Sequence, residues 1–156
     1  MRKVKTKFKL SYITLILSLL SFLTVFLGFI KINDLTISGL DVVLARNIKY
    51  NSVSNAGIVF NFTYILAFIL VLFSGIISLM EDKASLIIAM IFNVISLIFI
   101  ILIPSNLSVK TVFGDNQLIK DVLPCMLSYG GIIMIVLISG CIILEGLRLQ
   151  KLFKNK

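Results

Sequence analysis

The sequence has no histidine and no tryptophan, and charged residues fill only 14% of its 156 positions. Without histidine the chain offers no imidazole ligands for zinc, no paired imidazoles for haem and no histidine acid–base catalysis. Soluble domains carry about 25% charged residues, so water would not solvate the whole surface of this chain. These absences exclude several catalytic classes and argue against a soluble protein.

Short catalytic motifs are also missing. The sequence contains no C-x-x-C pair, no G-x-S-x-G elbow and no glycine-rich phosphate loop. Its two cysteines, Cys125 and Cys141, would be about 24 Å apart on one helix, too far for a mutual disulfide. We expect both to be small apolar side chains, with an intermolecular bridge through Cys125 as the alternative. The chain is therefore expected to be no enzyme and to hold no metal or cofactor.

Long uncharged runs dominate what is present, at residues 10–30, 50–80, 84–109 and 122–144. Each reaches the roughly 20 residues that a helix needs to cross about 30 Å of hydrocarbon. A backbone in lipid must satisfy its own hydrogen bonds, and the alternating pattern of a β-barrel is missing. The sequence predicts an all-α membrane protein, a single four-transmembrane-helix bundle over residues 1–156 with spans at about 10–30, 58–80, 84–103 and 122–147.

The positive charge indicates the orientation. Lysine and arginine outnumber the acids by 15 to 7, and placing both termini inside leaves five cationic residues outside: Lys31, Arg46, Lys49, Lys110 and Lys120. The other ten then lie inside, which predicts a multi-pass protein of the cell membrane, N-in and C-in. The basic tails predict contact with anionic lipid headgroups, and no nucleic-acid partner is expected. The lysine-, isoleucine- and asparagine-rich composition is typical of an AT-rich bacterial genome.

Two outer loops follow from this topology, at residues 31–57 and 104–121. Residues 34–45 are apolar around a Ser38-Gly39 turn signal and predict a short β-hairpin. Residues 107–113 alternate at period two and predict a strand that pairs with this hairpin. Residues 81–83 predict a tight inner turn, and Pro104 predicts the end of the third span. The fold class therefore includes a small β-element built from the two outer loops.

One face of the first span carries small or β-branched residues at spacings of three and four: Ser11, Thr14, Ser18, Ser21, Val25 and Gly28. Helices in lipid associate where small residues allow close approach and where hydroxyls form hydrogen bonds. We interpret the row as a helix-packing seam, with the polar lining of a pore or substrate path as the alternative. Shorter rows of small residues in the other spans predict a compact left-handed bundle.

Two amides and one carboxylate lie within the predicted spans: Asn61, Asn93 and Glu145. An unpaired amide in mid-span would cost several kcal/mol, so Asn93 is expected to bond a neighbouring helix, with a ligand contact as the alternative. A carboxylate within a span is a hypothesis of function. For Glu145 we expect instead a pair with Arg148, three residues on, that reaches the inner interface, with the functional site as the alternative.

Four spans, inward termini and a longer first outer loop resemble claudin-type tetraspan proteins in architecture. The tryptophans and paired cysteines of that family's first loop are missing here, so the resemblance implies no residue roles and no activity. The expected function is that of a non-enzymatic accessory, scaffold or interaction subunit, with a membrane-protein partner or a second copy. The alternatives are a subunit of a small transporter or channel, and an immunity protein against a membrane-active peptide.

Overall fold

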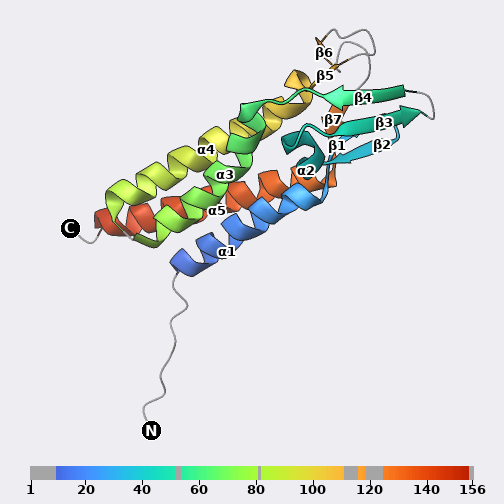
Figure 1. The fold of residues 1–156 in the computed structure, drawn as a ribbon. Helices are drawn as coiled ribbons and strands as arrows, with labels where there is room; N and C mark the ends of the chain where they lie inside the picture. Colours follow the sequence, from blue (N-terminus) through green and yellow to red (C-terminus); the bar gives the residue numbers. More distant parts are fainter. Residues whose placement is uncertain (1–9, 52–53, 81, 111–115, 119–124, 155–156) are drawn as a thin grey trace.

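A computed structural model describes residues 10–51, 54–80, 82–110, 116–118 and 125–154. The described chain is mostly helical, and strands gather at one end of a bundle of parallel and antiparallel helices (Figure 1). We call this the sheet end and the opposite end the far end. The elements of the bundle are α1 (Leu10–Leu23) with the 3-10 turn η1 (Thr24–Phe26), α3 (Phe62–Ile77) with η2 (Ser78–Met80), α4 (Lys83–Asn106) and α5 (Tyr129–Lys154).

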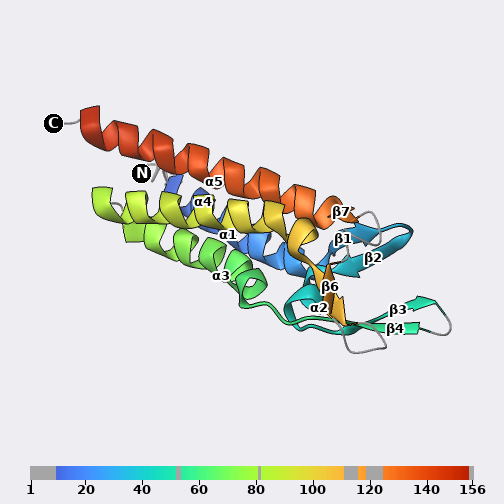
Figure 2. The same cartoon turned by 90° about the horizontal axis from the view of Figure 1, so that it is seen from above.

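The four helices form a closed ring of neighbours. Helix α1 packs against α3 and α5, and α4 packs against the same two helices (Figure 2). Residues 62–80, 83–106 and 129–154 are each long and apolar enough to cross a bilayer, whereas α1 with η1 is shorter. These lengths and compositions support a membrane-embedded helical protein.

The first and last helices are placed differently from the predicted spans. Helix α1 ends at Leu23 and not at Ile30, because the apolar run continues as strand β1 (Gly28–Ile32) with Phe29 and Ile30 fully buried. Apolarity alone does not separate a buried strand from a helix. Helix α5 begins at Tyr129 and not at 122, and it extends past 147 to Lys154. The proline at 124 lies outside the described residues.

Helix α4 passes through Pro104 to Asn106, so the prediction that it stops at the proline is wrong. Proline lacks the N–H that would bond the carbonyl four residues earlier. Side chains satisfy carbonyls in this last turn: Tyr64 of α3 donates its hydroxyl to the carbonyl oxygen of Asn106 at 2.8 Å, and Ser105 donates to that of Leu102 at 2.9 Å. The tie to α3 holds the helix end in place.

The two loops do form β structure, but not with the predicted pairing. An antiparallel three-stranded sheet has the order β2 (Leu35–Ser38), β1, β7 (Cys125–Leu127). A four-stranded sheet has the order β3 (Asn47–Asn51), β4 (Ser54–Ile58), β5 (Ser108–Lys110), β6 (Asn116–Leu118). The strand from the second loop, β5, therefore pairs with β4 and β6 and not with the hairpin; residues 111–113 lie outside the described part.

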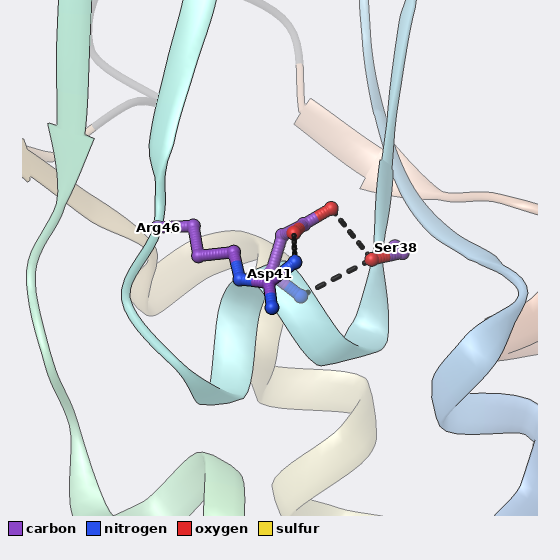
Figure 3. A network of polar contacts seen from close by, with 3 residues as sticks. All are labelled: Ser38, Asp41 and Arg46. Atoms are coloured by element: carbon purple, nitrogen blue, oxygen red, sulfur yellow. Dashed lines mark hydrogen bonds and ion pairs between the residues drawn. The ribbon is translucent and has the colours of Figure 1, made fainter.

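The predicted hairpin over 34–45 is wrong in its second half, because Ser38-Gly39 starts a helix. The hairpin consists of β1 and β2, and α2 (Gly39–Val43) follows directly. Figure 3 shows how Ser38 caps α2: its hydroxyl accepts from the Asp41 N–H at 3.1 Å and donates to the Asp41 carboxylate at 2.6 Å. Arg46 pairs with the other oxygen of that carboxylate at 3.4 Å. A serine–glycine pair can mark a helix N-cap as readily as a turn.

The apolar core lies at the sheet end. It joins residues from the strands and from the sheet-end halves of the helices: Val25, Phe29, Ile30, Tyr64, Phe68, Val71, Ile100, Ile103, Met134 and Ile138. The rings of Phe29 and Phe68 are in contact, with 5.1 Å between their centroids. This core fixes the sheets onto the helices and leaves the far half of the bundle to be held together in another way.

Candidate functional site

Polar side chains occupy the interior of the far half of the bundle. The buried set includes Ser11, Thr14, Ser18, Ser74, Ser78, Ser85, Asn93, Glu145 and Arg148. The outer surface of the helices at the same level carries exposed apolar residues such as Ile16, Ile91 and Leu147. In this half the interior is therefore more polar than the surface.

A chain of hydrogen bonds joins three helices at one level. Ser74 of α3 donates its hydroxyl to the amide oxygen of Asn93 at 2.7 Å, and the amide nitrogen of Asn93 donates to Glu145 Oε2 at 3.0 Å. Helix α1 joins through Ser18, whose hydroxyl lies 3.6 Å from the Cys141 sulfur. We call these five residues the polar layer. Every helix of the bundle contributes at least one group to it.

Asn93 lies near the middle of α4, ten residues or about 15 Å from its start at Lys83. It is fully buried at 0% exposure, with one partner on each neighbouring helix. The sequence predicts such a bond for Asn93, since a buried amide without a hydrogen-bond partner is costly. The choice of Glu145 as a partner did not follow from the sequence.

Glu145 is also 0% exposed, so the expectation that it reaches the interface is wrong. Helix α5 continues nine residues beyond it to Lys154, about 14 Å, which is further than a glutamate side chain extends. Its Oε2 accepts from Asn93, and its Oε1 is buried with no hydrogen-bond partner among the described residues. The carboxylate therefore belongs to the bundle interior.

Arg148 lies one turn beyond Glu145 on the same helix and is 8% exposed. Its Nη2 donates to the carbonyl oxygen of Ser78 at 2.6 Å, which ties α5 to the end of α3. A cavity of about 170 Å³ next to it is lined by Leu86, Arg148, Lys151 and Leu152. Neither Asn93 nor Glu145 lines this cavity, so the polar layer lies deeper than the cavity.

The row on α1 lies inside the bundle. Ser11, Thr14, Ser18 and Ser21 are the buried residues of α1, and Val25 is buried in η1. Thr14 and Ser21 donate to carbonyl oxygens four residues earlier in their own helix, at 3.1 and 2.8 Å. A Cβ placed on Gly75 of α3 would come within 2.5 Å of the Ser18 Cβ, so α1 and α3 approach closely there.

The remaining predicted residues lie elsewhere. Gly28 is the first residue of β1, and its N–H donates to the Tyr129 hydroxyl at 3.1 Å. Asn61 is the N-cap of α3, with its side-chain oxygen accepting from the Thr63 N–H at 3.0 Å. Both residues are at the sheet end, so the structure does not bring them to the polar layer.

Two members of the buried far half were missed as site residues: Cys141 and Arg148. The signal was present in the sequence, because Cys141, Glu145 and Arg148 follow one another at spacings of four and three and so share one helix face. Among the described residues no group of three or more histidine, cysteine, aspartate or glutamate side chains is arranged to hold a metal ion. The layer has hydrogen-bonding chemistry.

Cys125 lies in β7 and is half-buried. Burial raises the pKa of its thiol to about 11, so the thiolate that attacks disulfides or electrophiles is scarce at neutral pH. The structure therefore gives this cysteine low reactivity.

No protein-family model matches the chain, and comparisons with curated proteins and with solved structures give no match either.

Proposed function

We propose that this chain is a four-span protein of the cell membrane, with α1 as the fourth span and both termini in the cytoplasm, that works as an accessory or scaffold subunit and not as an enzyme. Exposed aromatic residues support the placement. Phe26, Phe60, Phe62 and Tyr129 lie where helices meet strands, and Tyr12 and Phe153 lie near the far end. Aromatic belts of this kind mark the two membrane interfaces. Lys83, Lys151 and Lys154 at the far end fit a cytoplasmic face.

The observation that carries the proposal is the closed state of the polar layer. Asn93 and Glu145 are fully buried and bonded to each other across helices. A transport path needs such groups to line a cavity that reaches one side of the membrane. In lipid, hydrogen bonds between helices replace the missing hydrophobic attraction. The polar layer therefore suits a scaffold protein, in which it holds the four helices together as a stable bundle.

The sheet end suits contact with a membrane-protein partner or a second copy. Strand β2 is an edge of its sheet, and Leu44 and Met126 expose about half of their side chains outside the helices. An unpaired strand edge with apolar neighbours is a template for another chain. We assign the association to this surface.

The orientation is tested with single cysteines in a background that lacks Cys125 and Cys141. A membrane-impermeant maleimide added to intact cells should label cysteine at position 44 and leave position 150 unlabelled. Both positions are exposed, so access to the reagent depends on the side of the membrane. Labelling of position 150 from outside would contradict the topology.

The association is tested by placing a photo-crosslinker at Met126 in cells. A discrete adduct that disappears with Leu44→Asp, while the protein stays folded, is the expected result. The matched control is a crosslinker at Val136, which is exposed on α5 but lies on the helix. If the adduct at position 126 persists in Leu44→Asp, or if no adduct forms at position 126, the sheet end is not the contact surface.

The second candidate is a transporter or channel subunit. The observation that favours it is the buried Glu145 Oε1, which has no hydrogen-bond partner among the described residues. Cysteine at position 93, in the same cysteine-free background, separates the two functions. The closed bundle predicts protection from a water-soluble thiol reagent, because residue 93 is inaccessible. Rapid modification would favour the transport function.

A further inference from the structure

We propose that the groove between α4 and α5 near the far end binds one anionic phospholipid, with an acyl chain along the groove and the phosphate beside Lys83. The inference rests on the membrane placement of α4 and α5. It does not depend on the scaffold role.

The groove has a volume of about 350 Å³ and an entirely apolar lining: Ile87, Met90, Ile91, Val94, Ile95 and Leu149. Ile87, Ile91 and Val94 recur at spacings of four and three along one face of α4, and each exposes between two-fifths and half of its surface. From Ile87 to Ile95 the groove follows the helix for about 12 Å. It is a shallow channel that runs along α4.

The lining decides between a lipid chain and a partner helix. Helices in lipid dock where glycine, alanine or serine lets the backbones approach. None of the six lining residues is small. Ser85, Ala89 and Ser96 of α4 are buried on the other face, and the exposed Ala84 lies one turn before Ile87, outside the lining. A thin, flexible acyl chain fits between long and branched side chains, whereas a helix would be kept at a distance. The groove therefore suits lipid.

The charge at the far end of the groove selects the headgroup. Lys83 lies one turn before Ile87, and Phe153 lies one turn after Leu149, so both continue the groove toward the interface. The Lys83 ammonium lies 4.1 Å from the centre of the Phe153 ring, a cation–π contact that holds it there. Lys151 and Lys154 add positive charge on α5, against Asp82, which caps α4. A phosphate beside Lys83 meets a net positive surface.

The chain contains no tryptophan, so one introduced residue is a sole fluorescent reporter. Ile91→Trp places it in the groove, and Met90→Trp is a second reporter there. Leu147→Trp is the control: like Ile91 it lies two residues from the bonded pair Asn93–Glu145 toward the far end, and it is exposed outside the groove. Each variant is reconstituted into phosphatidylcholine vesicles that contain brominated phosphatidylglycerol or brominated phosphatidylcholine.

At positions 90 and 91 the brominated phosphatidylglycerol should quench with about fivefold higher relative affinity than brominated phosphatidylcholine. Lys83→Ala should remove this preference, and position 147 should show little of it with or without Lys83. Equal quenching by both lipids in the groove would overturn the proposal. So would an equal preference at position 147, which would indicate a general attraction to the basic tails. Quenching by neither lipid, together with self-association, would show that a second copy fills the groove.

Discussion

The two halves of the bundle are built from the same helices but are held together differently. At the sheet end, large apolar side chains such as Phe29, Phe68 and Met134 fill the interior. In the far half the interior includes hydroxyls, an amide, a carboxylate and a guanidinium, beside a few apolar residues such as Leu86 and Ala89. Burial of apolar surface stabilises a structure where water is the alternative surrounding. Within lipid, close approach and hydrogen bonds remain.

The largest expected effect tests the apolar half. Phe29→Ala removes a fully buried ring that packs on Phe68, and it should lower the free energy of unfolding by about 3–5 kcal/mol. Unfolding of the detergent-solubilised protein, followed by circular dichroism, measures the change. Phe26→Ala is the control, because Phe26 is largely exposed, and it should change stability far less. Equal costs would show that the sheet end is not packed as a core.

Close approach in the far half is tested by a pair of glycines. Gly75→Ala would bring a methyl group within 2.5 Å of the Ser18 Cβ and should cost about 1–3 kcal/mol through overpacking. Gly146→Ala meets nothing within 4 Å and should be neutral or stabilising by up to about 1 kcal/mol, since alanine favours helix. Thermal unfolding of the purified variants shows whether each substitution lowers or raises stability. Adding Ser18→Gly to Gly75→Ala should restore stability; no recovery would place the strain elsewhere.

The hydrogen bond at the polar layer is tested by a double-mutant cycle. Asn93→Ala, Glu145→Ala and their combination should give a coupling free energy of about 0.6–1.7 kcal/mol, the range of interhelix hydrogen bonds in lipid. Denaturant titration in mixed micelles provides the four unfolding free energies. The cycle of Val94→Ala with Glu145→Ala should show almost no coupling, because Val94 faces away from the interior. If the coupling free energy is zero in both cycles, the hydrogen bond between Asn93 and Glu145 does not stabilise the far half.

The smallest effect concerns the turn that joins α3 to α4. Hydrogen bonds from the Ser85 side chain and its N–H to Asp82 hold the pKa of that carboxyl below its usual 3.8. A lowered pKa adds stability above the ordinary value, and this stability is lost as the pH falls through the folded-state pKa. Asp82→Asn keeps an N-cap but does not titrate. Between pH 6 and pH 3 the unfolding temperature should therefore fall slightly less in Asp82→Asn than in the unchanged chain. An identical fall in both proteins would contradict this.

The sequence predicts what depends on spacing within one helix. The buried face of α1 is an example, because residues three and four apart must share a face. It does not predict where α1 ends, since the run from Val25 to Ile30 stays apolar while the backbone changes from helix to strand. That change depends on β7, a strand far along the chain that pairs with β1.

The same limit applies to the polar layer. Asn93 needs a partner on physical grounds, but which residue lies opposite it depends on how α4 and α5 are aligned. Glu145 therefore looked like an interface residue when it was judged by its distance from the predicted end of its span. The extension of α5 to Lys154 moves it into the interior. Helix ends and helix alignment are tertiary properties.

The pairing of β1 with β7 sets an order of assembly during synthesis. Strand β1 directly follows the first helix and β7 directly precedes the last, with Ile30 opposite Leu127 and Ile32 opposite Cys125. The contact between Gly28 and Tyr129 beside them spans 101 positions of the chain. At about 5–20 residues per second, a ribosome takes about 5–20 s to make that stretch. During this interval β2 can pair with one edge of β1, while the edge that later binds β7 has no partner strand. The first helix is thus joined to the last only after the other two helices have been made.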